Sequence, residues 1–285
     1  MSRIERDWFL ALRRLALGCT LLLGSAASIA APKFGEETLA LELGGFLSDF
    51  DTEVALKGPG GGTSIDLEDQ LGFDSDQSTF RGELAWRFAP RHRLILGYYN
   101  FDRSASGAAE GQIVIDDPDN GLIEIDAGVS VKSDFDWELI PVSYAYSFYK
   151  TEATEVAASL GVHWVSTDFG VKGTFTLNEE KSRFVAQSES ASGPLPVFGL
   201  EADHALTQNW HVGAHAQYFT LDYDDYSGEL VDLRLQTEYW FAENFGAGVG
   251  YTWYSIDLTV DKGKGYKLIG DFDYGGLEAY LAFRF

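Results

Sequence analysis

The segment GLEAYLAFRF, residues 276–285, alternates strictly between two kinds of side chain. One set is wholly apolar, and the other carries both charges of the segment. The two sets are Leu277, Ala279, Leu281, Phe283 and Phe285, and Glu278, Tyr280, Ala282 and Arg284. Side chains of a β-strand point alternately to its two faces, so the segment predicts a strand whose faces meet two different environments. The nature of these environments decides what the protein can be.

Residues 1–30 have the layout of a secretory signal peptide: a basic start, an apolar run, and the small residues Ser28 and Ala30 before Ala31. The apolar run, Leu15–Leu23, is too short for a spanning helix, which needs about 20 residues. We therefore expect residues 1–30 to be removed and residues 31–285 to form a single domain. The one cysteine, Cys19, would leave with the signal, so no disulfide is expected.

The charge of the chain limits its partners. Without residues 1–30 it carries 17 basic and 42 acidic side chains, a net charge of −25. Such an acidic chain has no basic patch for nucleic acid or for an anionic membrane surface. No later apolar run approaches the ~18 residues of a transmembrane helix. A periplasmic protein, a secreted protein and an outer-membrane barrel remain.

The alternation of the last segment recurs along the chain, with apolar faces of about ten residues that often end in Trp, Tyr or Phe. A transmembrane strand needs about 9–11 residues, apolar outside and polar inside, with aromatic residues at both interfaces. The predicted strands are 38–48, 78–88, 92–103, 135–149, 155–169, 194–206, 209–221, 229–241, 244–257 and 272–285. The third and fourth are the least regular, because Leu94–Phe101 is apolar at either parity and Pro141 favours a bulge. Eight and twelve strands are the alternative counts.

Short and long connections alternate between these strands. The short ones are 89–91, 150–153, 207–209 and 242–244, and the long acidic ones are 49–77, 103–134, 170–193, 221–228 and 257–271. This asymmetry is typical of an outer-membrane barrel with tight periplasmic turns and long outer loops. Residues 111–127 carry their own hairpin signal around Asn120-Gly121, so several strands are expected to continue beyond the membrane.

The predicted fold is therefore all-β: a transmembrane antiparallel β-barrel. The alternative is a soluble sandwich or lipocalin-like barrel, in which the apolar face would point inward. The alternating connections, the ten-residue apolar faces and the aromatic last residue together favour the membrane barrel.

On its signal peptide, its loop asymmetry and the segment Tyr280–Phe285, the chain resembles the small β-barrel outer-membrane proteins of Gram-negative bacteria. The resemblance implies a location in the outer membrane. It also implies that Phe285 is an assembly signal, read by the machinery that folds barrels into that membrane. It selects no functional subfamily.

If the apolar faces meet lipid, the charged faces line the lumen. The expected lumen charge network consists of Glu42, Arg81, Glu83, Arg87, Glu201, Arg234, Glu238, Glu278 and Arg284. The first and last strands must close the barrel, so Glu278 and Arg284 are expected near Glu42. A lumen of about ten strands is barely wider than the side chains that fill it. We therefore expect a structural or surface-interaction protein with a filled lumen, and a narrow channel for ions or small solutes is the alternative.

An outer-membrane enzyme is the second alternative, but no catalytic, metal or cofactor site is expected. His163, Ser166 and Asp168 lie close in sequence, but on a strand Ser166 and Asp168 point away from His163. Acidic clusters in the outer loops offer oxygen ligands that Ca²⁺ and Mg²⁺ prefer, but none has the spacing of a calcium loop. The clusters are Asp66, Glu68 and Asp69; Asp74 and Asp76; Asp116, Asp117 and Asp119; and Asp222, Asp224 and Asp225.

The expected partners follow from these interpretations. They are outer-membrane lipid, lipopolysaccharide and the barrel assembly machinery, with divalent ions as possible bridges between the acidic loops and lipopolysaccharide phosphates. A closed barrel has no free strand edge that needs a second copy, so a monomer is expected.

Overall fold

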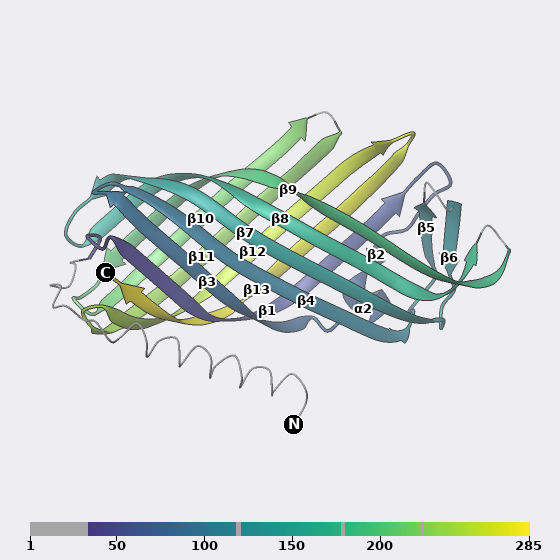
Figure 1. Ribbon diagram of the computed structural model, residues 1–285, viewed down its shortest axis with the longest axis horizontal. Coiled ribbons are helices and arrows are strands. Elements are labelled where there is room, and N and C mark those ends of the chain that lie inside the picture. The colour runs from purple at the N-terminus through teal and green to yellow at the C-terminus, as the bar shows by residue number, and fades with distance from the viewer. Residues whose placement is uncertain (1–33, 118–120, 178–179, 224) are drawn as a thin grey trace, which may run out of the picture. The chain divides into compact units, whose positions relative to one another are not determined.

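The computed structural model describes residues 34–117, 121–177, 180–223 and 225–285. The predicted signal peptide lies outside these residues and stays a prediction. In the described part the chain forms a 13-stranded antiparallel sheet and one short helix (Figure 1). No helix in this part is long and apolar enough to cross a membrane.

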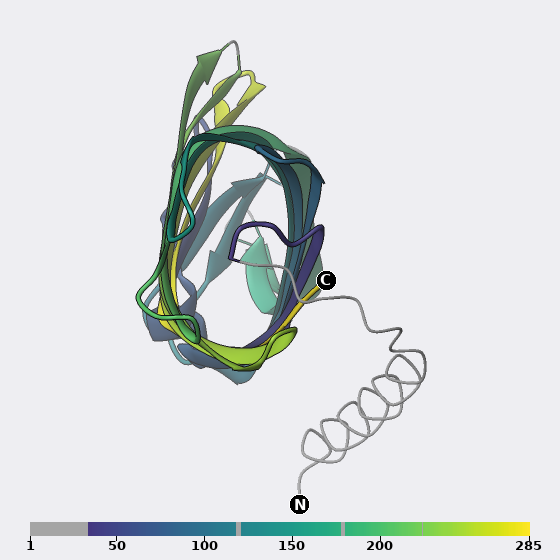
Figure 2. The same ribbon diagram turned by 90° about the vertical axis from the view of Figure 1, so that its left-hand side faces the viewer.

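Ten of the strands form a closed ring, which Figure 2 shows end-on. Their order is β8-β7-β4-β3-β1-β13-β12-β11-β10-β9, and β9 pairs again with β8. The ten strands are β1 (Leu39–Lys57), β3 (Asp76–Ala89), β4 (His92–Ala108), β7 (Ser130–Lys150), β8 (Thr154–Leu177), β9 (Glu180–Ala205), β10 (Trp210–Tyr223), β11 (Tyr226–Ala242), β12 (Phe245–Gly263) and β13 (Tyr266–Arg284). The first and last strands close the ring, as in the register pair Leu47↔Leu277. The antiparallel barrel and the count of ten are confirmed.

The strand ends at the short turns agree with the sequence prediction to within one residue. The opposite ends extend further, by two or three residues on β3, β10 and β11 and by more on the other strands. The strands β8 and β9 contain 24 and 26 residues, more than twice the length that crosses a membrane. Most of the expected outer loops are therefore strand, as in the β12–β13 hairpin, where two residues separate Gly263 from Tyr266. The predicted extension of strands beyond the membrane is confirmed.

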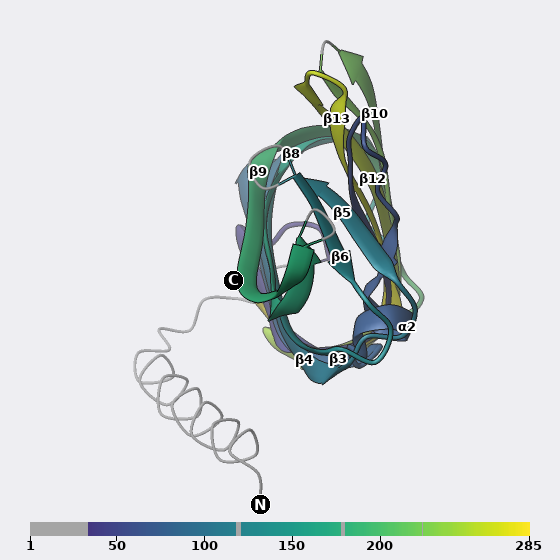
Figure 3. The same ribbon diagram turned by 90° about the vertical axis from the view of Figure 1, so that its right-hand side faces the viewer.

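Two outer connections contain structure of their own. The β1–β3 connection holds β2 (Ile65–Asp66) and the helix α2 (Leu67–Leu71), whose first turn is capped by the Asp66 carboxylate. The β4–β7 connection forms the expected hairpin, β5 (Ile113–Asp117) and β6 (Gly121–Ile125), although its turn residues 118–120 lie outside the described part. Figure 3 shows β5 and β6 within the outline of the ring and α2 at its edge.

The faces of the strands point as the sequence predicted over the part next to the short turns. On β13 Leu277 is 63% exposed whereas Glu278 is 2% exposed. The other large apolar side chains on the outside include Trp86, Leu96, Leu160, Trp164, Leu200, Leu235, Phe241, Val249 and Leu281. An apolar outer wall of this extent needs lipid around it, so the soluble alternative with an apolar interior is wrong for this half of the barrel.

Further along the same strands, the outward face becomes charged and the inward face becomes apolar. On β1 Leu47 is the last large apolar outward residue, and Asp49 and Asp51 follow on the outward face, while Phe46 and Phe50 point inward and are buried. We call the part on the turn side of this change the membrane half, and the part beyond it the outer half. The outer half is filled by apolar side chains, which the sequence analysis did not predict.

The strands β4 and β7, whose inward and outward faces were ambiguous in the sequence, have no bulge at Pro141. On β4 Leu94, Leu96 and Tyr98 point outward, so Tyr99 and Phe101 point inward. The β4–β7 register is the same on both sides of Pro141, which corrects the expected bulge. Pro141 lies opposite Gly97, where an added Cβ would come within 2.7 Å of the proline ring. The absence of a side chain on Gly97 therefore makes room for the ring.

Candidate functional site in the barrel interior

The centre of the membrane half is organised around Arg81 of β3, which is 1% exposed. Its guanidinium lies 2.9 Å from Glu42 of β1, 3.2 Å from Glu83 and 3.3 Å from Glu278 of β13. It also lies 5.1 Å from the centre of the Tyr280 ring. These groups meet because they occupy inward positions at similar heights on three neighbouring strands. One cation thus compensates three carboxylates.

Arg234 of β11 joins this cluster from the other side of the barrel. Its guanidinium is 2.8 Å from Glu83, donates to the Tyr99 hydroxyl at 2.5 Å and lies 3.8 Å from Glu278. Three strands separate β3 from β11 on one side of the ring and five on the other, so the Arg234–Glu83 contact spans the lumen. We call Glu42, Arg81, Glu83, Tyr99, Arg234 and Glu278 the central cluster.

Glu238 and Arg284 have other partners. Glu238 accepts hydrogen bonds from the Trp240 indole at 3.1 Å and from the Tyr280 hydroxyl at 3.3 Å. The Arg284 guanidinium lies 4.0 Å from the centre of the Trp240 ring and donates to the Glu243 carbonyl. Among the described residues no ion pair joins Arg284 to Glu42, although the register places the two on the same face of neighbouring strands. In the register of β1 and β13, Arg284 pairs with Ala40, and Glu42 pairs with Ala282. The two charged side chains are therefore at different heights, two residues apart along the strands.

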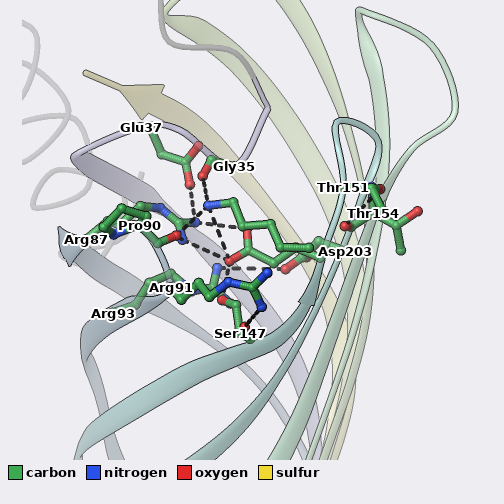
Figure 4. Close-up of polar contacts among 12 residues, drawn as sticks. Gly35, Glu37, Arg87, Pro90, Arg91, Arg93, Ser147, Thr151, Thr154 and Asp203 are labelled. Carbon is green, nitrogen blue, oxygen red and sulfur yellow. Dashed lines mark hydrogen bonds and ion pairs between the residues drawn. The ribbon is translucent and has the colours of Figure 1, made fainter.

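A second cluster lies nearer the short turns (Figure 4). Arg87 contacts Glu155 of β8 at 2.8 Å and Glu37, which precedes β1, at 3.0 Å. Arg93 of β4 contacts Glu201 of β9 at 2.8 Å. The predicted network is thus divided: Arg87 and Glu201 belong to this turn-side cluster and have partners that the network did not include. Arg93 was missed because the parity of its strand was ambiguous in the sequence.

The segment before β1 packs against the inner side of the wall at this end. Lys150 donates to the Gly35 carbonyl at 2.5 Å and to the Pro90 carbonyl at 2.7 Å. The ring of Phe34 lies 4.9 Å from that of His211, edge to face. These contacts hold residues 34–37 across the inner side of the wall.

A polar cavity of about 170 Å³ lies in the membrane half. Its lining includes Glu83, Arg93, Glu201 and Arg234, so it contacts both clusters. The buried carboxylate oxygen Oε1 of Glu201 has no hydrogen-bond partner within the protein. A polar space of this size accommodates several water molecules, which would satisfy such atoms.

His163 is part of the buried packing of this half. Its ring is hydrogen-bonded to Gln217 at 2.6 Å and stacks on Tyr254 with ring centres 5.9 Å apart. Ser166 and Asp168 occupy positions of the opposite parity on β8, as the sequence indicated. The three residues therefore do not form a nucleophile, base and orienting group in line.

The outer half contains a buried cation apart from these clusters. Arg103 of β4 contacts Glu68 of α2 at 2.5 Å and donates to the Thr52 hydroxyl at 3.1 Å. Its guanidinium also lies 4.7 Å from the centre of the Phe50 ring and 5.2 Å from that of Phe73. Arg103 therefore ties α2 to the inside of the barrel. The sequence analysis placed residue 103 at the junction of the predicted strand 92–103 and the outer loop 103–134, and it missed this role.

Several residues of the predicted acidic clusters have protein partners. Asp66 caps α2, Glu68 pairs with Arg103, and Asp116 accepts from the Gly60 amide at 2.6 Å. Asp119 and Asp224 lie outside the described residues. Among the described residues no group of three or more His, Cys, Asp and Glu side chains is placed to hold a metal ion.

A row of carboxylates crosses the outside of the outer half instead. Glu53, Asp271, Asp257 and Glu229 are register partners on β1, β13, β12 and β11. Partial burial and the neighbouring Asp257 carboxylate raise the pKa of Asp271 from 3.8 to about 6. Like charges on neighbouring strands repel, so this acidic row favours bound counterions.

The chain was compared with known proteins. It is similar to the crystal structure of the outer membrane protease OmpT from Escherichia coli, with a TM-score of 0.56, 10% identity, and coverage of 92% of this chain and all of that one. The OmpT likeness and the apolar outer wall agree on the class of fold. The chain has the fold of an outer-membrane β-barrel.

Other solved structures resemble this outer-membrane β-barrel more loosely. The attachment invasion locus protein Ail of Yersinia pestis has a TM-score of 0.32 at 11% identity, covering 86% of this chain and 97% of that one. The toluene transporter TodX of Pseudomonas putida has a TM-score of 0.32 at 10% identity, covering 92% and 94%. No protein-family model and no curated protein matches the sequence. A shared fold at this level of identity assigns no activity to the chain.

Proposed function

We propose that this outer-membrane β-barrel is closed to ions and solutes and acts as a structural or surface-interaction protein through its acidic outer wall. The observation that carries the proposal is the Arg234–Glu83 ion pair of 2.8 Å between nearly opposite strands. A contact of this length leaves no space between the two side chains for a hydrated ion.

Two further levels support a closed lumen. On the turn side, Arg87 and Glu155 join strands that are separated by β4 and β7. In the outer half, Leu67 and Leu71 of α2 and Ile113 and Ile125 of the β5–β6 hairpin are buried in a common apolar core. An apolar constriction opposes the entry of hydrated ions because it offers no replacement for their water.

The alternative is a narrow channel through the polar cavity. It requires both charged clusters and the apolar core to open together. Each cluster breaks only by leaving buried charges unpaired, which is costly.

Single-channel recording in a planar bilayer tests the closed lumen. We expect the refolded barrel, with insertion verified by its heat-dependent migration on gels, to show no steady conductance. An Arg234→Ala and Glu238→Ala pair should also stay silent, because the turn-side cluster and the apolar core are intact. A steady wild-type conductance whose ion selectivity changes in this pair, but not in an exposed Lys172→Ala control, would establish the channel instead.

The proposed surface role concerns lipopolysaccharide. Single carboxylates of the acidic row would share divalent cations with lipopolysaccharide phosphates, since carboxylate and phosphate oxygens both suit Ca²⁺. We expect calcium to raise the melting temperature of the barrel in bilayers that contain lipopolysaccharide, and an Asp257→Asn, Asp271→Asn variant to respond less. Equal responses of variant and wild type would reject the acidic row as the calcium-binding surface.

A further inference from the structure

The wall of the outer half is interrupted between β9 and β10. These strands pair only from Phe198↔Tyr218 to Ala205↔His211. Beyond Phe198, β9 remains paired with β8, while β10 continues with β11, and Figure 1 shows the two hairpins diverging. We call this interruption the seam.

The inner face of β10 is exposed at the seam. Leu221 has the same parity as the buried Phe219, yet it is 37% exposed. An inward-facing leucine gains this exposure because no β9 residue covers it. The seam is therefore lined by apolar surface on at least one side.

An apolar cavity of about 110 Å³ lies in the outer half, and β9 at the edge of the seam contributes to its lining. Phe169 of β8 and Ala191 of β9 contribute to one side, and Leu258 of β12 and Phe272 of β13 to the other. None of its lining residues is charged, and Thr167 and Ser190 are the two with polar side chains. This composition contrasts with the polar cavity of the membrane half and with the acidic outer wall.

The size and the lining fit a small apolar guest. Cavities of about 150 Å³ lined by Leu, Ile and Phe stay dry and bind benzene. Phe135 and Phe272 add an aromatic wall, since both line the cavity and their rings stack with centres 5.5 Å apart at 18°. Burial of an apolar molecule here would remove its surface from water at little polar cost.

The surroundings of the cavity argue against a lipid chain and against an anionic guest. Its residues Phe169, Leu258 and Gly270 directly neighbour Asp168, Asp257 and Asp271 in sequence. Carboxylates on the outer face place this level beyond the hydrocarbon of the bilayer. A lipid chain would have to leave the membrane to reach the cavity, and an anion would have to pass the acidic wall.

We propose that this cavity binds a small neutral hydrocarbon, about the size of one aromatic ring, which enters from the aqueous side through the seam. The site lies beyond the charged clusters, and its occupation does not depend on whether the lumen conducts. It adds a ligand-binding activity to the closed barrel.

Equilibrium uptake of benzene from a headspace tests the site, with the barrel in phosphatidylcholine nanodiscs and protein-free discs subtracted. Ala191→Phe places a ring in the cavity, whereas Ser192→Phe places the same ring on the opposite face of β9. Leu258→Asn puts an amide in the lining without adding bulk, and it serves if Ala191→Phe fails to fold. Heat-dependent migration on gels verifies folding of each variant.

We expect saturable uptake of benzene by the wild type and by Ser192→Phe. Its affinity should fall by about tenfold or more in Ala191→Phe and in Leu258→Asn. Benzoate, measured by equilibrium dialysis, should not bind. Uptake that is not saturable, or that is equal in the wild type and both lining variants, would overturn the site, and equal binding of benzoate would overturn its preference for a neutral guest.

Discussion

Replacement of Arg81 by methionine tests whether the central cluster stabilises the barrel. The substitution keeps an unbranched side chain but removes the cation that lies 2.9–3.3 Å from Glu42, Glu83 and Glu278. At an effective dielectric constant of 20, each such contact contributes about 5 kcal/mol of attraction. Much of this attraction only offsets the cost of burying the charges. Breaking a buried ion pair from one side typically costs about 3–5 kcal/mol, and we expect a loss in that range.

The free energy of unfolding is best measured by urea titration of the barrel in lipid vesicles, followed by tryptophan fluorescence and by gel migration. The matched control is Lys172→Met. Lys172 and Asp134 are 3.5 Å apart with side chains 53% and 57% exposed, so this exposed pair should contribute at most about 1 kcal/mol.

A second variant separates the charge effect from lost packing. Adding Glu278→Gln to Arg81→Met removes one of the carboxylates that lost Arg81 and leaves Arg234 to compensate the others, so we expect it to restore about 1–2 kcal/mol of the loss. If Arg81→Met costs no more than Lys172→Met, or if Glu278→Gln adds to the loss, the cluster does not stabilise the barrel through charge compensation.

Three other changes have distinct outcomes. Because the folded state raises the pKa of Asp271 to about 6, this carboxyl should add stability as the pH falls from about 6 to about 4. Asp271→Asn should therefore melt at a higher temperature than wild type at pH 7 and at the same temperature near pH 4, and a difference independent of pH would contradict this. Gly276→Ala should prevent closure of the barrel, since the added Cβ would come within 1.9 Å of a β1 carbonyl oxygen. In the control Gly275→Ala the added Cβ meets only the end of a side chain at 2.9 Å. Equal yields of the two folded variants would refute this. Phe285→Ala should reduce the amount of folded barrel in cells. It should not reduce refolding in vitro, because the backbone amide of residue 285 still donates to the Leu39 carbonyl. Unchanged amounts in cells would exclude an assembly signal.

The sequence predicted the wall of the barrel better than its interior. Alternation identifies which face of a strand a residue occupies, and this was enough for Arg81 and Glu278. It does not identify a partner on the far side of the lumen, which depends on ring closure and on the stagger of the strands. Alternation therefore could not predict the Arg234–Glu83 contact or the partners of Arg284. Arg93 was missed for a simpler reason, because both faces of its strand are apolar enough to meet lipid.

The apolar core of the outer half has a sequence signal that differs from the one used to find the strands. On β13 the apolar residues Leu277 and Leu281 point outward in the membrane half, whereas Asp271 and Asp273 point outward in the outer half. The period of two continues through this change, but the inward residues are now apolar, as Phe272 shows.

The same exchange occurs on β1 at the paired height, since Leu47 pairs with Leu277 and Asp51 with Asp273. A strand that exchanges its faces has left one environment and entered another. Below the change its outer face meets lipid, and above it the outer face meets water, so the barrel must there be packed like a soluble protein. This requirement explains why α2 and the β5–β6 hairpin fill the outer half with apolar side chains, and why an apolar cavity can exist inside a wall whose outer surface is acidic.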